Sequence, residues 1–181
     1  GGPLSMATPF YSADFEHSQD YQPARAGKLL DDAGWTSRDA EGYRSKDGKR
    51  LRATVLIGAR TPPSELTLWE QVQATTREAG IELVLEQMSD VQVTARQAAW
   101  DYDIRTGYWN TNTPDVLRII FSSAFVQPAG VGGYHQNSSG YADPGFDSLL
   151  DQALATQQPE QRRALYQQAQ AQAAGQYLQL T

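Results

Sequence analysis

The sequence predicts an α/β fold, and three observations support this class. Segments with helical periodicity alternate with short segments of strand-like alternation along most of the chain. Over residues 51–86 a strand, a helix and a second strand follow one another, with a crossover long enough for a parallel pair. Hydrophobic residues make up 40% of the 181 residues, which is enough for a proper core. We therefore expect one or at most two globular domains in which helices cover a sheet.

The first part of the chain is predicted to be an irregular lead-in followed by a helix. Residues 1–22 contain prolines and small polar residues and show no sustained period. A helix is expected to begin at Pro23 and to close at Gly34, because apolar residues recur at helical spacing between them. Trp35 follows this helix and is expected in the core.

A hairpin and a strand-helix-strand unit are predicted next. Lys46-Asp47-Gly48-Lys49 predicts a tight turn between strands over residues 42–45 and 51–59, because Asp-Gly supplies the positive φ that such a turn requires. Strand 51–59 has apolar residues on both faces and is therefore expected to be central. A helix over residues 61–80 and a strand over residues 81–86 complete the unit.

The stretch from residue 101 to residue 123 is predicted to carry the ligand site. Side chains alternate from Tyr102 to Tyr108 as in a strand, and a helix is predicted from Pro114, with Thr113 as its N-cap. A strand's carboxyl end and a helix's amino end meet here, where open α/β sheets bind ligands. For any single aromatic residue, packing in the core is the competing interpretation. The predicted ligand-binding residues are Tyr108, Trp109, Asn110, Thr111 and Asn112, with Arg105 and Asp115 as charged partners.

A glycine-rich loop and two paired helices are predicted in the last third of the chain. The loop over residues 129–140 lacks a phosphate-binding pattern, and His135 within it is a candidate for ligand contact. Asn137-Ser138-Ser139 matches a glycosylation acceptor tripeptide, a match that also arises by chance. Helices that begin at Pro144 and Pro159 are expected to pack as a pair, and the glutamines of the second to form a solvated face.

Charge and composition exclude several classes of function. The net charge of −6 argues against nucleic acid or an anionic membrane as partner, because both carry charge of the same sign. The chain has no cysteine, which excludes disulfides, thiolate zinc sites and thiol catalysis together. No apolar run is long enough to cross a bilayer, and the first residues lack the features of a signal peptide. The chain does not begin with methionine, so we expect a segment of something larger.

The sequence offers little for catalysis. Its two histidines, His17 and His135, lie far apart, and no metal-hydrolase or triad motif is present. Neither a cofactor nor a metal site is predicted. A small α/β enzyme that uses Asp101, Asp103 or His135 remains the alternative to a binding protein. An interaction module that binds protein partners through the glutamine-rich helix is a third interpretation.

Blocks of residues in a specific order resemble a known family. In chain order they are Tyr21-Gln22-Pro23, Ala33-Gly34-Trp35, Gly42-Tyr43-Arg44, Lys46-Asp47-Gly48-Lys49, Ala79-Gly80-Ile81, Pro114-Asp115, and Ser139-Gly140-Tyr141-Ala142-Asp143-Pro144. Each block is short. Their order and spacing are similar to those of the bacterial extracellular solute-binding proteins of family 5, the oligopeptide, dipeptide and nickel receptors of ABC importers.

The resemblance implies the carboxy-terminal lobe of such a receptor, a three-layer α/β lobe of a type II periplasmic-binding-protein-like fold without enzymatic activity. The lobe would span residues 23–175, with the lead-in 1–22 and a terminal strand over residues 176–181 near the hinge. A peptide-like or other small polar solute, a missing amino-terminal lobe, and permease and ATPase subunits would be its partners. The setting would be periplasmic or extracellular, with a lipid anchor as one option for the full-length protein.

The chain departs from the family at one predicted ligand residue. In peptide-binding members a carboxylate shortly before the proline that matches Pro114 holds the ammonium group of the ligand. Asn110 stands four residues before Pro114 here, and its neutral amide keeps a hydrogen bond but loses the counter-charge. Arg105 lies where a ligand carboxylate could be met, although the same alternation is compatible with a solvent-facing side chain.

Overall fold

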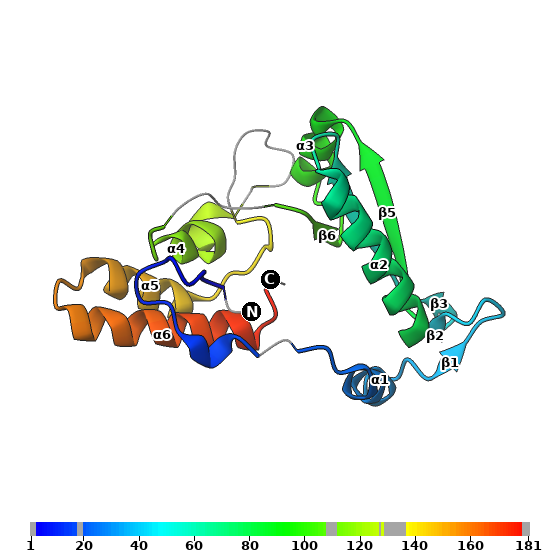
Figure 1. Ribbon diagram of the computed structural model, residues 1–181, viewed down its shortest axis with the longest axis horizontal. Helices are drawn as coiled ribbons and strands as arrows, with labels where there is room; N and C mark the ends of the chain where they lie inside the picture. The colour runs from blue at the N-terminus through cyan, green and yellow to red at the C-terminus, as the bar shows by residue number, and fades with distance from the viewer. Residues whose placement is uncertain (1–2, 18–19, 108–111, 127, 129–136, 179–181) are drawn as a thin grey trace. The chain divides into compact units, whose positions relative to one another are not determined.

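The computed structural model describes residues 3–17, 20–107, 112–126, 128 and 137–178, which form two compact units (Figure 1). Unit one consists of residues 1–20 and 108–181, and unit two consists of residues 21–107. Each unit has its own cluster of buried hydrophobic residues. The boundaries of these units differ from the single lobe over residues 23–175 that the sequence analysis drew, because the lead-in packs with the last third of the chain.

The main sheet of unit two is parallel and has its longest strand at the centre. Strand β4 (Arg52–Gly58) lies between β5 (Glu82–Met88) and β6 (Ile104–Arg105), and it pairs in parallel with both. The predicted central strand and parallel pair are therefore confirmed. Strand β6 is only two residues long, much shorter than the strand predicted from Tyr102 to Tyr108.

A helix covers this sheet at the position where the sequence predicted one, over residues 61–80. Helix α2 (Pro63–Ala79) packs Leu66, Trp69 and Val72 against the buried strand residues Val55, Ile57 and Leu83. Gly80 ends α2 with a φ of 89°, a left-handed conformation in which glycine is unstrained. Helix α3 (Asp90–Ala98) begins with a capping box between Ser89 and Gln92, which satisfies backbone N–H groups of the first turn.

A small antiparallel sheet completes unit two. Strands β1 (Ser37–Arg38), β2 (Arg44–Lys46) and β3 (Lys49–Arg50) lie in this order. The predicted turn is confirmed, because Asp47 and Gly48 have φ angles of 52° and 74°. The sequence did not indicate β1, which is too short to show alternation.

Helix α1 (Pro23–Asp32) precedes this sheet and contains no buried residue. Gly34, with a φ of 87°, follows the helix as predicted. Trp35 is only partly buried, so the prediction that it belongs to the core is wrong.

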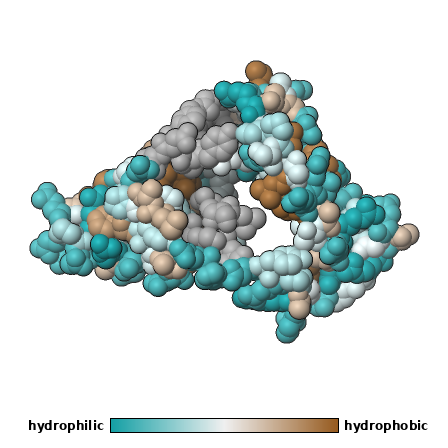
Figure 2. Space-filling model, viewed as in Figure 1, coloured by the Kyte–Doolittle hydropathy of each residue, from teal (hydrophilic) through white to brown (hydrophobic). Residues whose placement is uncertain are grey.

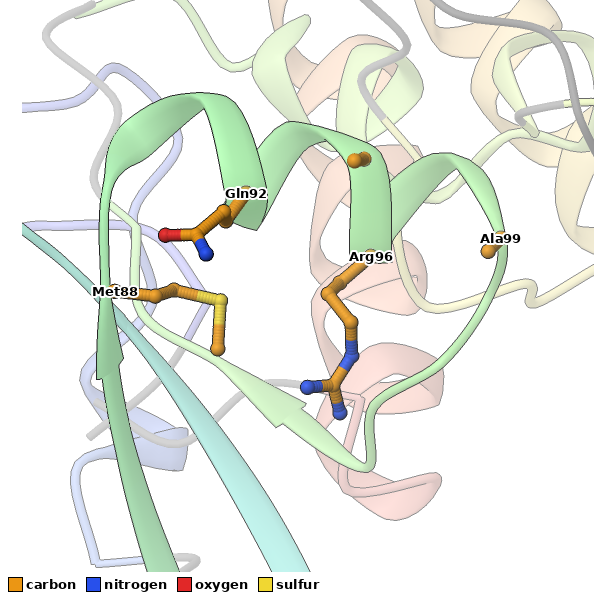
Figure 3. Close-up of a pocket in the computed structure, with 5 residues that line it drawn as sticks. Met88, Gln92, Arg96 and Ala99 are labelled. Carbon is orange, nitrogen blue, oxygen red and sulfur yellow. The ribbon is translucent and has the colours of Figure 1, made fainter.

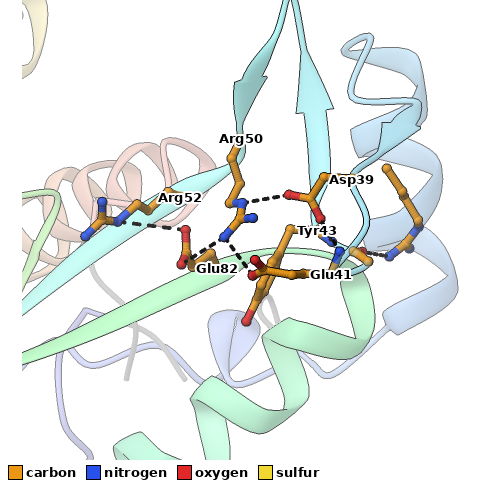
Figure 4. Close-up of polar contacts among 8 residues, drawn as sticks. Asp39, Glu41, Tyr43, Arg50, Arg52 and Glu82 are labelled. Carbon is orange, nitrogen blue, oxygen red and sulfur yellow. Dashed lines mark hydrogen bonds and ion pairs between the residues drawn. The ribbon is translucent and has the colours of Figure 1, made fainter.

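Charged residues link the small sheet to the main sheet (Figure 4). The Arg50 guanidinium lies 2.7 Å from Asp39, 3.1 Å from Glu41 and 3.2 Å from Glu82, and 4.7 Å from the ring centre of Tyr43. Burial acts to raise the pKa of Asp39, but hydrogen bonds from backbone N–H groups and from Arg50 outweigh it and hold this pKa below its usual value.

Unit one is a helical assembly in which the lead-in takes part. Its elements are η1 (Ala13–Phe15), α4 (Val116–Phe121), η2 (Ser123–Phe125), α5 (Pro144–Ala155) and α6 (Pro159–Gly175). Helices α5 and α6 pack against each other, which confirms the predicted pair. The buried core includes Leu117, Phe121, Phe146, Leu150, Tyr166 and Ala169. Residues 176–178 do not form the predicted strand, because Gln176 caps α6 and Tyr177 has a φ of 52°; residues 179–181 lie outside the described part.

Gln170 fixes the lead-in to α6. Its side chain is fully buried, accepts a hydrogen bond from the Ser12 amide at 3.2 Å, and donates to the carbonyl oxygens of Phe10 at 2.9 Å and Tyr166 at 3.0 Å. The rings of Phe10 and Tyr166 stack with centroids 5.5 Å apart. The prediction that the glutamines of this helix are solvated is therefore wrong for Gln170, because both ends of its amide find partners in the interior.

Asp147 gives unit one a stability that depends on pH. Its carboxylate accepts hydrogen bonds from the backbone N–H of Ser123 at 2.9 Å and from the Ser123 hydroxyl. Burial acts to raise the pKa of Asp147, yet these hydrogen bonds hold it below its usual value. A depressed pKa contributes stability above the unfolded-state pKa, and this contribution is lost as the pH falls through the folded-state pKa.

We therefore expect Asp147→Asn to lower the free energy of unfolding by about 1 kcal/mol at pH 7, and by much less near pH 3. Urea unfolding at both pH values measures the difference. Glu78→Gln is the control, because Glu78 is exposed and has no ion pair within the described residues. An equal loss for Asp147→Asn at both pH values would contradict the role of its charge.

Candidate functional site

The structure describes part of the predicted site. Arg105 lies in unit two, while Asn112 and Asp115 lie in unit one. Asn112 is exposed, and Arg105 and Asp115 are partly buried. The other predicted ligand residues, Tyr108, Trp109, Asn110, Thr111 and His135, lie outside the described residues.

The helix after the predicted corner begins at Val116, two residues later than expected. Asp115, and not Thr113, precedes the first residue of α4, and its side chain makes no capping hydrogen bond. Instead, the Thr113 hydroxyl accepts a hydrogen bond from the Asp115 amide at 3.3 Å and donates to the Asp115 carboxylate at 3.1 Å. The prediction of Thr113 as N-cap is therefore wrong, because its hydroxyl accepts from the Asp115 amide in the turn before the helix and not from an amide of the first helical turn.

The carboxylate of Asp115 is engaged within unit one. It accepts hydrogen bonds from the Tyr166 hydroxyl and from the Arg162 guanidinium at 3.2 Å, both on α6. Tyr166 is 1% exposed, and burial followed by the hydrogen bond to Asp115 raises the pKa of Tyr166 to about 12. The Tyr166 hydroxyl therefore stays protonated at neutral pH and donates to Asp115. Asp115 thus connects the start of α4 to α6.

The carboxylates of the alternative enzyme interpretation are also engaged. Asp101 lies 2.5 Å from the Nε of Arg96, and the Asp103 carboxylate accepts a hydrogen bond from the Thr54 amide at 2.7 Å. The first contact connects Asp101 to α3, which precedes it. The second connects Asp103, just before β6, to β4. Among the residues that the structure describes, no group of three or more histidine, cysteine or acidic side chains is placed to hold a metal ion.

A shallow groove of about 330 Å³ lies between β5 and α3 (Figure 3). It is lined by Met88, Gln92, Ala95, Arg96 and Ala99. Its position at the carboxyl end of β5 matches the place where open α/β sheets bind ligands. Arg96 does not offer a free charge to this groove, because its guanidinium also contacts Glu86 at 2.6 Å.

Two hydrophobic side chains on the helices of unit two are exposed. Val91 on α3 is 80% exposed and Leu68 on α2 is 56% exposed. Figure 2 shows hydrophobic surface over this part of the molecule. Within the described residues, no helix is both long enough and apolar enough to cross a bilayer.

The asparagine of the glycosylation motif has a structural role. Asn137 is fully buried, and its side-chain amide donates to the carbonyl oxygens of Ser122 at 3.0 Å and Tyr141 at 2.9 Å. Its side-chain oxygen accepts hydrogen bonds from the backbone N–H and the hydroxyl of Ser139. In the folded unit, this amide nitrogen is therefore not accessible for modification. The Asn-x-Ser spacing was the one sequence signal for this structural role, because an asparagine side chain can accept a hydrogen bond from the backbone two residues later in a turn.

A comparison with protein families identifies the chain. The family model described as bacterial extracellular solute-binding proteins, family 5 Middle, matches residues 1–130. The chain belongs to this family. This confirms the resemblance inferred from the short sequence blocks.

Curated relatives of this family member bind different solutes. The chain is 28% identical to the nickel-binding periplasmic protein of Escherichia coli strain K12 over 167 residues, which are 90% of this chain and 30% of that protein. It is 26% identical to the di/tripeptide-binding protein 4 of Pseudomonas aeruginosa strain UCBPP-PA14 over 162 residues, 86% of this chain and 27% of that protein. The chain thus spans less than a third of the length of these relatives.

Solved structures confirm the predicted fold class. The oligopeptide-binding protein AppA of Bacillus subtilis in complex with a nonapeptide matches with a TM-score of 0.79 and 22% identity, over 98% of this chain and 34% of that chain. MoaA of Agrobacterium tumefaciens R10 in complex with mannopinic acid matches with a TM-score of 0.78 and 17% identity, over 98% of this chain and 32% of that chain. The chain has the α/β fold of type II periplasmic binding proteins.

Proposed function

We propose that this family member is the carboxy-terminal lobe of the substrate-binding component of an ABC importer. The observation that carries the proposal is the family match over residues 1–130, together with a structural match over 98% of the chain to a peptide-binding receptor. The chain covers 34% of that receptor, which agrees with one lobe of a larger protein. The missing amino-terminal lobe would close over the solute, and a permease and an ATPase would receive it.

The solute is a small polar molecule, and the protein works in the periplasm or outside the cell. The printed names of the relatives include nickel and di- or tripeptides, and a structural neighbour holds mannopinic acid. These solutes are all hydrophilic, and they differ in charge and shape. The proposed activity is binding and delivery without chemical conversion of the solute.

We place the solute at the corner over residues 108–112, with the Trp109 indole as the apolar contact. Aromatic area with adjacent amides and hydroxyls is typical of small-molecule sites. Asp115 is assigned a supporting role here, since Arg162 and Tyr166 already bind its carboxylate. Asn110 is expected to meet the polar head of the solute as a neutral group.

Truncation of the indole tests this site. Trp109→Ala in the full-length receptor is expected to weaken solute binding by about 2 kcal/mol, or roughly thirtyfold in Kd. The solute is identified by mass spectrometry of the purified receptor, and its affinity is measured by isothermal titration calorimetry. Tyr21→Ala is the control, because Tyr21 is 71% exposed in unit two and is not part of the predicted site.

The outcomes separate the function from the site. If no solute co-purifies and the receptor binds neither di- and tripeptides nor nickel with histidine, the proposed function is wrong. If a solute binds and Trp109→Ala leaves its affinity unchanged, the function stands and the corner over residues 108–112 is not the binding site.

A further inference from the structure

We propose that the outer edge of β5, together with the groove beside α3, binds an extended segment of a partner protein by adding it to the sheet as a further strand. This site is separate from the proposed solute site, because β6, which leads to residues 108–112, pairs with the opposite side of β4. The inference goes beyond the proposed function and does not depend on the identity of the solute. It rests on backbone groups along the strand and on an uncharged groove next to them.

The backbone groups of β5 point toward β4 and away from it in alternation. The Glu82 amide donates to the carbonyl oxygen of Leu51, just before β4, at 2.9 Å, so the even-numbered residues of β5 face the sheet. Leu83, Leu85 and Gln87 therefore direct their N–H and C=O groups outward. Within the described residues no strand pairs with this edge, and the outward groups of Leu85 and Gln87 have no hydrogen-bond partner.

Gln73 shows where the open part of this edge begins. Its side-chain amide, on α2, donates to the Leu83 carbonyl oxygen at 2.7 Å and so occupies that group. In the part of the chain that the structure describes, no side chain does the same for Leu85 or Gln87. Unpaired groups along an edge strand are a template for another extended chain, since its backbone supplies the matching acceptors and donors.

Helix α3 leaves room beside this edge. A Cβ atom at Gly58 of β4 would stand 3.9 Å from Cγ2 of Val93, so that side of α3 packs over the central strand. The stripe that turns toward β5 recurs at helical spacing and lines the groove with Met88 (Figure 3); it consists of Gln92, Ala95, Arg96 and Ala99. Since Met88 directly follows Gln87, a strand added at this edge would place alternate side chains against the groove.

The charges at the groove are balanced within unit two. Arg96 contacts Glu86 at 2.6 Å and Asp101 at 2.5 Å, and the other lining residues are uncharged. Val91 is 80% exposed and stands one helical turn before Ala95, so it extends the apolar surface of the stripe. The charged ends of a short free peptide would find no free counter-charge here, whereas an internal segment of a longer chain needs none. The geometry therefore favours a protein segment with apolar side chains at alternate positions.

The test uses pentapeptides of the pattern Thr-Xaa-Thr-Xaa-Thr, with alanine, valine or leucine at Xaa. They are acetylated and amidated, so that they resemble an internal segment, and isothermal titration calorimetry measures their binding to the full-length receptor. The leucine peptide is expected to bind most tightly, because it buries the most apolar area in the groove. The same peptide with free ends should bind several-fold less tightly, because its charged ends lose water without gaining a partner.

Variants and hydrogen exchange locate the bound peptide. Ala95→Glu places a charge in the groove and should weaken binding of the leucine peptide about tenfold. Thr94→Glu is the matched control, since Thr94 is exposed on the same helix and does not line the groove, and it should keep the affinity. Exchange of the Leu85 and Gln87 amides should slow when the peptide is bound. Trp109→Ala should also keep the affinity, because the solute corner is a separate site.

Three results would overturn the inference. They are the failure of all the acetylated and amidated peptides to bind, equal losses for Ala95→Glu and Thr94→Glu, and tighter binding of the peptide with free ends. Loss of peptide binding in Trp109→Ala would overturn it as well, since the peptide would then occupy the proposed solute site. Circular dichroism of each variant checks that its fold is intact. The proposed function is decided separately, by whether the receptor binds a solute at all.

Discussion

Phe146→Ala is expected to lower the free energy of unfolding by about 3–5 kcal/mol, because the residue is fully buried and a cavity would remain in its place. Phe146 lies on α5 at the centre of the core of unit one. Its ring meets the Tyr141 ring edge-on at 5.6 Å and the Phe121 ring at 6.5 Å between centroids. Both partners would lose their contacts on one side. Urea unfolding followed by circular dichroism measures the loss as a lower midpoint at unchanged slope.

The control for this substitution lies on the same helix. Leu154 is 48% exposed, so Leu154→Ala should change the free energy of unfolding by no more than about 0.5–1 kcal/mol. Phe146→Leu should fall between the two, because leucine fills part of the cavity. Equal losses for Phe146→Ala and Leu154→Ala would show that unit one does not depend on this core.

The elements that the sequence predicted well are those with a local physical signal. Strand β4 has apolar residues on both faces, and Leu56 on the second face is 1% exposed, as a central strand requires. Asp143 accepts hydrogen bonds from the first amides of α5, and Pro144 follows it. In both cases the information lies within a few neighbouring residues.

The polar residues that connect distant segments within one unit could not be predicted in this way. Gln170 is separated from Ser12 by 158 residues, so neither its burial nor its partner has a local signal. Glutamine is usually exposed, and a helix rich in glutamine favours a solvated face. The lead-in lacked any period because it is held by such long-range contacts and not by regular structure.

The candidate site also has some features that the local sequence predicts and others that depend on distant residues. The strand, the polar corner and the following proline could be read from residues 101–115, because each has a composition of its own. The role of Asp115 could not, since its partners Arg162 and Tyr166 are 47 and 51 residues away.

Arg44 is the polar residue whose removal should cost unit two most. It lies on β2 and is 8% exposed. Its guanidinium donates to the carbonyl oxygens of Trp35 at 2.6 Å and Ala79 at 2.9 Å, and it pairs with Asp31 at 2.5 Å. Ala79 is the last residue of α2, where a helix leaves carbonyl groups without partners, Asp31 lies in the last turn of α1, and Trp35 follows that helix. One side chain thus joins both helix ends to the small sheet.

Arg44→Met is expected to lower the free energy of unfolding by about 3 kcal/mol, because methionine keeps the apolar stem but leaves those carbonyl groups without a donor. Arg44→Lys should lose less, since an ammonium group can reach only some of the same acceptors. Urea unfolding followed by tryptophan fluorescence suits this test, because Trp35, Trp69 and Trp100 all lie in unit two.

Arg25→Met provides the matched control for this prediction. Arg25 is an exposed arginine on α1, so the same change of residue there should alter the free energy of unfolding by less than about 0.5 kcal/mol. Water can satisfy the helix ends if they open to solvent, and Arg44→Met would then behave like the control. A loss of several kcal/mol confined to Arg44 would instead show that the helix ends remain shielded and that the guanidinium is their donor.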